Sequence, residues 1–306
     1  MPSIERNTFE LSKGGKNSKL QLILILLPGM TIFLLFTIYP IVKLLTMSFF
    51  DWNLGIHQQS FFIGLQNYRD VLSDPIGMHA IKNTICYTLI TVPSQIVIGL
   101  IIALMITSIK RFQIVYRTAY YLPVITSWVI VSILYRYIFN NEGLLNYLLV
   151  DRFYLFAANI QWLDNPFTAF FVIDSLGIWK GVGWNMVLFI AALSTVPIEL
   201  YESAELDGCG EYKKFVSITL PSIRENLLFA VVMLTIGGFN VYTSIKLLTD
   251  GEPMHKTEVT LTWMYRQAFV NREFGYAAAL SFIVTIIITV LALLQFKLFG
   301  RGNKNS

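Results

Sequence analysis

Charged residues are scarce in this chain of 306 residues: they make up 14% of it, whereas hydrophobic residues make up 55%. Soluble domains carry about 25% charged residues. The shortage of charge, together with a mean hydropathy of +0.60, therefore excludes an ordinary water-soluble protein and points to lipid as the solvent. Six membrane spans of about 20 residues each, with short loops, would use nearly the whole chain and leave no room for a soluble catalytic domain.

Cysteine and histidine are also rare. The two cysteines, Cys86 in an apolar run and Cys209 in a polar loop, lie in different environments and form no disulfide framework. The three histidines, at positions 57, 79 and 255, have no partners at metal-ligand spacing. We expect no metal and no other cofactor to be bound by this chain.

The motifs of ATP hydrolysis and of hydrolytic enzymes are missing. The segment Gly14, Gly15, Lys16 and Asn17 has neither the earlier glycine nor the Ser or Thr of a phosphate-binding loop, so the chain cannot hydrolyse ATP alone. No His-Glu-x-x-His or Gly-x-Ser-x-Gly sequence is present. The net charge of +4 is spread along the chain, which argues against nucleic acid as a partner.

What the chain has instead is six apolar runs, each long enough to cross about 30 Å of hydrocarbon as a helix. They lack the alternation of membrane β-strands, so we expect an all-α membrane protein. The first run is too long for a signal peptide and has no small-residue cleavage site, which predicts a retained span. The predicted spans comprise residues 20–45, 81–106, 116–139, 169–196, 227–248 and 276–299.

The distribution of Lys and Arg predicts the orientation, because cytoplasmic loops are enriched in both. Thirteen of them fall in the segments that share a side with the N-terminus, against five in the other loops. We therefore expect cytoplasmic tails at 1–19 and 300–306, with a six-helix transmembrane domain over 20–299. Trp52, Trp162 and Trp263 follow spans on the outer side, where an interfacial aromatic belt is expected.

The predicted cytoplasmic loop at 197–221 has the composition of two short helices. Pro197 suits a first helical turn, Glu199 and Glu202 lie near a positive helix N-terminus, and residues 207–210 (DGCG) provide a break. The second helix is expected over 211–218, ending before Pro221. The two short helices either dock into a cytoplasmic partner or form a solvated connector that lies on the lipid headgroups.

Residues 202–221, ESAELDGCGEYKKFVSITLP, resemble the EAA signature of ABC importer membrane subunits. In that family this loop forms coupling helices that sit in a cleft of the ATPase subunit. The resemblance implies that the coupling residues are Glu202, Ser203, Ala204, Asp207, Gly208, Phe215 and Pro221. Ser203 departs from the Glu-Ala-Ala triplet, but it is a small residue in place of another.

The resemblance extends over nearly the whole chain and is best for permeases of the carbohydrate-uptake type. It implies a type I ABC importer permease fold in a bacterial plasma membrane. Its implied partners are a second homologous permease, two ATPase subunits that use ATP and Mg, an extracellular solute-binding protein and a sugar, oligosaccharide or glycerol phosphate. Glu252 departs from the outer Thr-x-Gly-Gly-Pro element and adds a charge near the solute entrance. The matching segments are 64–68 (GLQNY), 83–84 (NT), Arg117 with 122–123 (LP), 143–146 (GLLN), 179–181 (WKG), 265–269 (YRQAF) and 274–276 (FGY).

A solute pathway is expected where polar and aromatic side chains enter the spans. Lys180 either faces a polar cavity or pairs with another helix, and the rotation between Asp174 and Lys180 excludes their pairing on a straight helix. Trp128 matches a sugar-contacting position of the related subunits, although aromatic residues also pack. Gly237 and Gly238 are either a flex point or a close helix contact. The pathway candidates are Trp128, Gly177, Lys180, Gly181, Asn185, Gly238, Asn240 and Tyr242.

Three classes of function remain open at this point: an ATP-driven permease subunit, an ion-coupled secondary transporter and an intramembrane enzyme. A secondary transporter is expected to have coupling carboxylates near the midplane and an internal repeat. Asp174 is the single acidic residue deep in a predicted span, and no repeat is evident. An enzyme needs a buried nucleophile and base, which are not found. The loop at 197–221 favours the permease.

Overall fold

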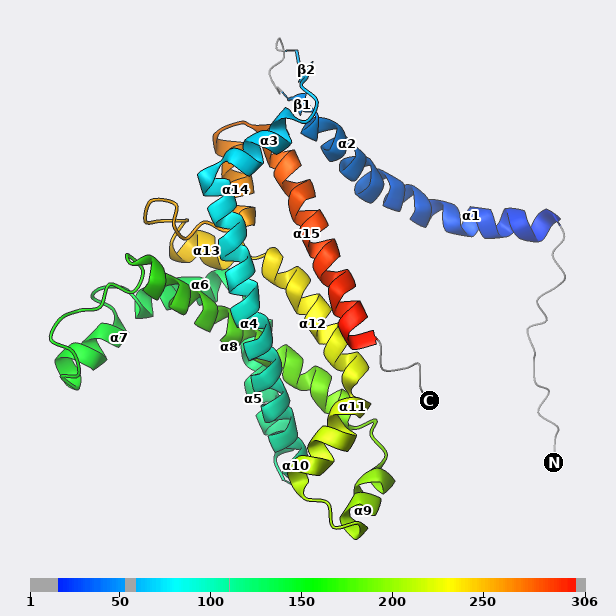
Figure 1. The fold of residues 1–306 in the computed structure, drawn as a ribbon, viewed down its shortest axis with the longest axis vertical. Helices are drawn as coiled ribbons and strands as arrows, with labels where there is room; N and C mark the ends of the chain where they lie inside the picture. Colours follow the sequence, from blue (N-terminus) through cyan, green and yellow to red (C-terminus); the bar gives the residue numbers. More distant parts are fainter. Residues whose placement is uncertain (1–15, 53–58, 110, 301–306) are drawn as a thin grey trace.

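The computed structural model describes residues 16–52, 59–109 and 111–300 (Figure 1). Within these residues the fold is helical apart from one two-stranded antiparallel hairpin. In chain order the elements are α1 (Lys16–Phe33), η1 (Leu34–Ile38), α2 (Tyr39–Ser48), β1 (Phe50–Asp51), β2 (Phe61–Phe62), α3 (Gln66–Ser73), α4 (Pro75–Ser108), α5 (Gln113–Ile125), α6 (Trp128–Ile138), α7 (Leu144–Asn146), η2 (Tyr147–Arg152), α8 (Pro166–Leu193), α9 (Ile198–Leu206), α10 (Glu211–Lys214), η3 (Phe215–Thr219), α11 (Leu220–Ser222), α12 (Arg224–Phe239), α13 (Thr243–Leu248), α14 (Thr260–Tyr265), η4 (Arg266–Val270) and α15 (Phe274–Gly300).

Four helices of the described chain are long and apolar enough to cross a membrane unbroken, and two bent pairs bring the number of candidate spans to six. The prediction of an all-α membrane protein with six spans is confirmed. The unbroken spans are Leu22–Ser48, Pro75–Ser108, Pro166–Leu193 and Phe274–Leu298, and the bent pairs are Gln113–Ile125 with Trp128–Ile138 and Glu211–Ser222 with Arg224–Phe239.

The third span is not the single continuous helix that the apolar run 116–139 predicts. The structure divides it into α5 and α6, which meet at an angle of 91°. At the break, the Lys180 ammonium group of α8 donates hydrogen bonds to the carbonyl oxygens of Pro123 and Thr126. Carbonyls at the end of a helix need such donors from outside the helix.

The fifth span also differs from its prediction over 227–248. Helix α12 ends at Phe239, directly after the Gly237–Gly238 pair, and α13 is a separate helix. The segment Glu211–Ser222 that leads into α12 is bent by 67° from it. Two glycines together weaken a helix, which explains why the apolar run alone does not fix its length.

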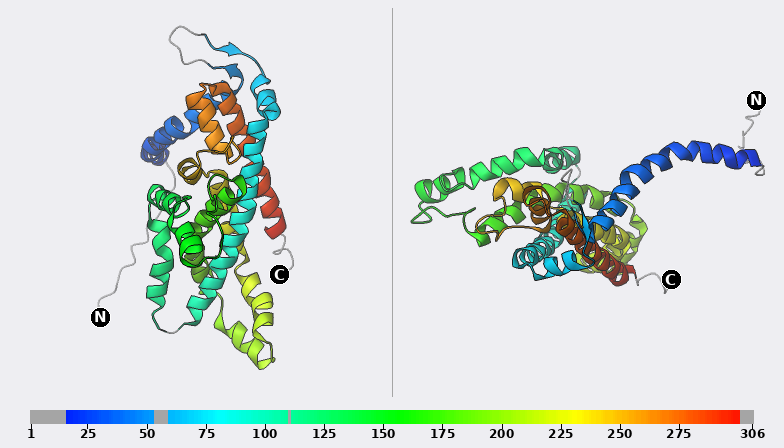
Figure 2. Two further views of the ribbon diagram at one scale, coloured as in Figure 1. Left: turned by 90° about the vertical axis from the view of Figure 1, so that its left-hand side faces the viewer. Right: turned by 90° about the horizontal axis from the view of Figure 1, so that it is seen from above.

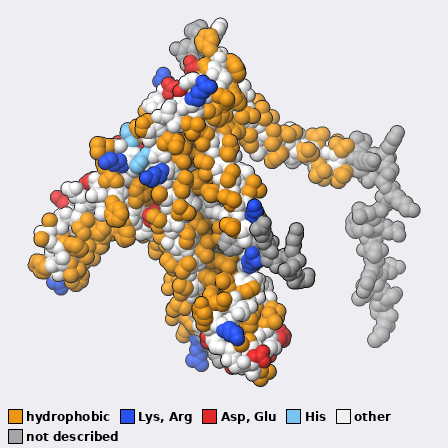
Figure 3. Space-filling view, in the orientation of Figure 1, with side chains coloured by type: hydrophobic (Ala, Val, Ile, Leu, Met, Phe, Trp, Pro, Cys, Tyr) orange, Lys and Arg blue, Asp and Glu red, His pale blue; other side chains and the backbone are white. Residues whose placement is uncertain are grey.

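The N-terminal helices α1, η1 and α2 form an arm that leaves the bundle. Figure 1 shows α1 directed away from the other helices, and the view from above in Figure 2 shows the same separation. None of the most apolar window of Leu22–Ser48 is buried within the chain. The described part of this arm is covered with hydrophobic side chains in the space-filling view (Figure 3). Its α2 end packs on α15, which anchors the arm.

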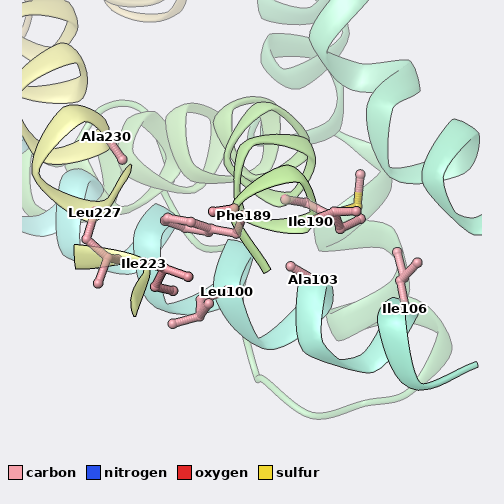
Figure 4. Packing of buried hydrophobic residues seen from close by; sticks show 10 residues of the cluster. Leu100, Ala103, Ile106, Phe189, Ile190, Ile223, Leu227 and Ala230 are labelled. Atoms are coloured by element: carbon pink, nitrogen blue, oxygen red, sulfur yellow. The ribbon is translucent and has the colours of Figure 1, made fainter. Parts of the chain in front are cut away.

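Long helices α4 and α8 pack along each other at the centre of the bundle and organise its three apolar clusters. One cluster joins these helices to α12 near the loop at 197–221; in Figure 4, Leu100, Phe189, Ile223 and Leu227 converge in it. A second joins α3, α4, α14 and α15 near the hairpin. The third lies between α8, α6 and α13.

Candidate coupling loop and solute pathway

Helix α9 ends in a tight left-handed cap. The N–H of Cys209 donates to the carbonyl oxygen of Ala204 at 2.9 Å, and that of Gly208 to Glu205 at 3.0 Å. This is a Schellman motif, which needs a residue at positive φ, and Gly208 provides it with a φ of +71°. Two predicted features of the loop, a first helix and a break at 207–210, are thus present. The helix begins one residue later than expected, with Pro197 as its N-cap.

The second helix of the loop is longer than predicted. It was expected to end before Pro221, but helical residues continue from Glu211 through Ser222. The π-turn Phe215–Thr219 comes before the proline and already breaks the regular i→i−4 ladder. Pro221 has no backbone N–H to donate, but the interrupted hydrogen-bond pattern does not need that donor. The helix therefore continues past the proline.

Polar contacts hold the two helices of the loop together. The Tyr201 hydroxyl of α9 and the Thr219 hydroxyl of η3 lie 2.8 Å apart. The Lys214 ammonium lies 3.1 Å from a Glu211 carboxylate oxygen and 3.5 Å from one of Glu205. The two helices therefore form one connected unit.

The seven predicted coupling residues separate into two groups. Glu202, Ser203, Asp207, Gly208 and Pro221 are exposed, and Ala204 is half-buried. Phe215 points inward instead and packs against the cluster that joins α4, α8 and α12. The exposed group lies where another protein can reach it, whereas Phe215 connects the loop to the bundle.

One face of α8 packs closely on α4. A Cβ at Gly177 would lie 2.4 Å from the Tyr87 hydroxyl, and one at Gly181 would lie 2.0 Å from the Gln95 side-chain oxygen. The Asn185 amide nitrogen lies 3.4 Å from the same Gln95 oxygen. These three predicted pathway residues lie between two helices of the same chain, in a polar seam in which Gly177 and Asn185 are buried and Gly181 is half-buried.

The adjacent face of α8 contacts the broken third span. Lys180 is 4% exposed, and its ammonium group makes hydrogen bonds of 2.7 Å to Pro123 O, 3.3 Å to Val124 O and 2.6 Å to Thr126 O. The same nitrogen lies 4.9 Å from the centre of the Trp128 ring. Trp128 itself is 40% exposed. Of the predicted pathway residues, the structure brings Lys180 and Trp128 together.

The candidates of the fifth span lie elsewhere. A Cβ at Gly238 would lie 2.6 Å from the Thr88 hydroxyl of α4, so this glycine allows close approach, whereas Gly237 has nothing within 4 Å. Asn240 is exposed and bonds its own helix. The Tyr242 ring lies 5.5 Å from the Tyr265 ring. These residues do not form one site with Trp128 within this chain.

Two ionisable groups deserve comparison with their predictions. Asp174 does not pair with Lys180, as expected, and its buried Oδ1 has no hydrogen-bond partner among the described residues. Glu258 was not singled out from the sequence. It is completely buried and lies 3.0 Å from the Arg266 Nε. In the sequence it looks like any loop carboxylate, so no pattern could have found it.

One residue of the predicted aromatic belt is in a different environment from the one expected. Trp263 is 5% exposed and its indole N–H donates to the Asp74 carboxylate at 2.9 Å. It is a buried residue of α14 and not an interfacial anchor. The error arises because residues 249–270, assigned to an outer loop, fold back against α4 and α15.

A bundle of apolar helices with a polar helix–turn–helix loop between two of its spans defines a helical membrane transport subunit. The model of the family described as "binding-protein-dependent transport system inner membrane component" matches residues 83–301. The chain belongs to this family.

Similar proteins and structures agree with this assignment. A probable ABC transporter permease protein, YurN of Bacillus subtilis (strain 168), is 35% identical over 92% of this chain and 96% of its own length. The arabinooligosaccharides transport system permease protein AraP of the same organism is 32% identical over 89% of this chain and 86% of its own. The crystal structure of a bacterial ABC transporter that imports alginate contains a chain with a TM-score of 0.80, 25% identity and coverage of 94% and 98%.

The family assignment confirms the type I importer permease fold and the transport class of function. The chain is a membrane-spanning permease subunit of the ABC importer type and not itself an enzyme. The comparisons give no support to the ion-coupled alternative.

Proposed function

We propose that this permease moves a sugar or oligosaccharide inward across a bacterial plasma membrane. The named substrates of its relatives support a carbohydrate: arabinooligosaccharides for AraP, lactose for the permease protein LacF of Rhizobium radiobacter, which is 30% identical, and alginate for the structural relative. Sugars suit a pathway in which an aromatic face such as that of Trp128 contacts their C–H surfaces.

The observation that carries the proposed coupling to ATPase subunits is the exposed tip of the loop. Leu206 is 90% exposed, beside the exposed carboxylates of Glu202 and Asp207. An apolar side chain flanked by acidic groups on a short, capped helix is suited to docking in a groove of a partner. Two ATPase subunits would bind and hydrolyse ATP with Mg, and this chain would bind neither.

A second permease subunit is supported by the arm of α1, η1 and α2. None of the most apolar window of this arm is buried in the described chain, and a helix that leaves its own bundle is suited to packing on a neighbouring subunit. An extracellular solute-binding protein is supported by the family description and by a second alginate transporter structure, whose periplasmic protein carries an alginate pentasaccharide.

Both termini are proposed to be cytoplasmic, at the same side as the loop. The Arg224 guanidinium at the start of α12 donates to the Leu298 carbonyl near the end of α15, at 3.3 Å. This contact brings the C-terminal end of the last span next to the coupling segment 197–221. The proposed tails at 1–19 and 300–306 lie mostly outside the described residues, although Lys16 already belongs to α1.

The proposed residues of the solute pathway remain Trp128, Gly177, Lys180, Gly181, Asn185, Gly238, Asn240 and Tyr242. Trp128 is the strongest candidate for direct contact because its ring is partly exposed at a break in a span. Gly177, Gly181 and Gly238 would act by permitting close helix packing rather than by touching solute.

The coupling proposal is tested by replacing Glu202 with lysine in transporter reconstituted with its partners into vesicles. We expect ATP hydrolysis to persist while uptake of the sugar presented by its binding protein falls at least tenfold, since a cation would repel the docking groove. Glu142→Lys, the same charge change at an exposed loop position outside the motif, is the matched control. Normal coupled uptake by Glu202→Lys would refute this role for the loop.

A further inference from the structure

The end of α5 is held by a side chain from another helix. The last four carbonyls of a helix have no intrahelical donors, and in a lipid environment water is not there to replace them. Here the Lys180 ammonium takes three carbonyl oxygens: Pro123 and Val124 in the last turn and Thr126 just beyond it. The Thr126 hydroxyl adds a local bond to Pro123 O at 2.6 Å.

Several features allow this lysine to reach the break. Gly183, one turn away on the same face of α8, has no side chain where a Cβ would lie 2.1 Å from the Tyr120 carbonyl oxygen. The two helices therefore touch at backbone distance. The positive charge is also favourable at a helix C-terminus, and the Trp128 ring, the first residue of α6, attracts it at 4.9 Å.

The alternative to this bend is a straight span. No proline follows Pro123 before the end of α6, so residues 126–130 could supply the N–H groups that a continuous helix needs. The bent form competes with that helix, and the bend requires outside donors for the carbonyls that it releases. Lys180 donates to three of the carbonyls at the break.

We propose that Lys180 is a positioning residue: by binding the carbonyls of Pro123, Val124 and Thr126 it holds the right-angle bend between α5 and α6 and fixes the Trp128 ring at that bend. Of the two alternatives that the sequence leaves open for Lys180, a polar cavity or contact with another helix, this role corresponds to the second. Only the importance of Trp128 for solute rests on the proposed function. The bend itself is independent of any substrate.

The bend can be measured as a distance. Spin labels at Ile114→Cys and Tyr137→Cys, both exposed positions near the far ends of α5 and α6, would be about 24 Å apart for a right-angle bend. They would be about 35 Å apart on a straight helix, at 1.5 Å per residue. The labels are placed in the full-length chain assembled with its partners in lipid vesicles, with Cys86→Ala and Cys209→Ala to remove the native thiols.

In the unaltered Lys180 background we expect the shorter distance. Lys180→Met should move most of the label-to-label distances to about 35 Å. Lys180→Arg should keep them near about 24 Å, because the guanidinium group donates to the same carbonyls. Lys246→Met is the matched control: this lysine pairs with Asp250, four residues further along the chain, and does not bind the carbonyls at the bend.

Two outcomes would overturn the proposal. If Lys180→Met keeps the shorter distance, the bend does not depend on the ammonium group. If Lys180→Arg moves to the longer distance together with Lys180→Met, the effect is one of shape and not of donors. Should Lys180→Met fail to assemble, Lys180→Gln decides in its place: a second population at the longer distance supports the proposal, and a single population at the shorter one refutes it.

None of these measurements uses a transported solute. If the transported solute is not a sugar, the distances between the spin labels stay the same. If Lys180 does not hold the bend, the family assignment stays the same. The two inferences can be tested separately in the same preparation.

Discussion

The two ends of the bundle are built from different interactions. At the end remote from the coupling loop, directional polar contacts join α4 to the segment 256–266: the Asn83 amide donates to Lys256 O at 2.9 Å and to Glu258 O at 2.8 Å, and the Thr84 and Thr260 hydroxyls lie 2.8 Å apart. At the loop end the contacts to the bundle are largely apolar, with Phe215, Leu220 and their neighbours in one cluster.

The difference indicates which end is built to keep its geometry. A buried hydrogen bond is lost when its partners shift by less than an ångström, whereas apolar packing is non-directional and tolerates small sliding movements. The polar end is suited to holding the helices in register, and the apolar end to passing a rigid-body movement from the loop into α4, α8 and α12. The following predictions test this contrast.

The largest effect is expected at the polar end, from Glu258→Ala. The Arg266 guanidinium would lose its completely buried partner but keep Asp250. The Thr262 hydroxyl and the His255 ring would also lose their contacts with Glu258, and the combined loss should lower the free energy of unfolding by about 3 kcal/mol. Unfolding in mixed micelles measures the loss. Glu225→Ala, at an exposed position of α12, should change the same quantity by less than about 0.5 kcal/mol. Equal effects of the two substitutions would contradict the contrast.

At the apolar end, Phe215→Ala should lower the free energy of unfolding by about 2 kcal/mol, less than for a fully buried phenylalanine because the ring is half-buried. It should also reduce uptake per ATP hydrolysed, since the loop loses its contact with the cluster. Tyr212→Ala is the control, because that aromatic ring is exposed on the same helical segment. Full coupling in Phe215→Ala would show that the loop transmits movement through other residues.

A smaller effect is expected from Tyr276→Phe, again at the polar end. The Tyr276 hydroxyl donates to the Asp74 carboxylate at 2.6 Å, but Trp263 and the Ile76 N–H also bond that carboxylate. Loss of one charge-assisted bond should cost about 1.5 kcal/mol. Uptake per ATP hydrolysed, measured in vesicles, should stay unchanged. If uptake per ATP hydrolysed falls in Tyr276→Phe, movement is transmitted through the polar end, and the contrast is wrong.

The smallest effect is expected at the turn of the loop. Gly208 has a φ of +71° and open space around it, so Gly208→Ala meets no clash and should cost about 1 kcal/mol through backbone strain alone. Gly210 has equally open space but an ordinary φ of −69°, so Gly210→Ala avoids this strain and loses only the N-cap preference for glycine, which is a smaller cost. Indistinguishable unfolding curves for the two variants would argue against the left-handed cap.

The coupling loop was largely predictable because its features are local. Glycine at the position that needs positive φ, acidic residues in the first turn and a break between two helices all leave marks within 25 consecutive residues. One expectation for the loop was wrong: the second helix does not end before Pro221, because a π-turn precedes the proline.

The bend in the third span was not predictable, because it depends on a residue more than fifty positions away. Apolar runs report which segments enter lipid, but they do not report which carbonyls another helix will satisfy. The same holds for Trp263 and Glu258, which the sequence presents as loop residues and the fold buries. In each case the deciding partner comes from another part of the chain.

The N-terminal arm has a consequence for how the protein is made. None of the most apolar window of Leu22–Ser48 is buried by the rest of the described chain. Cover for this helix therefore comes from lipid or from another subunit. Its maturation then depends on the concentration of whatever covers it, so the yield of a chain produced by itself should understate its stability in the assembled transporter.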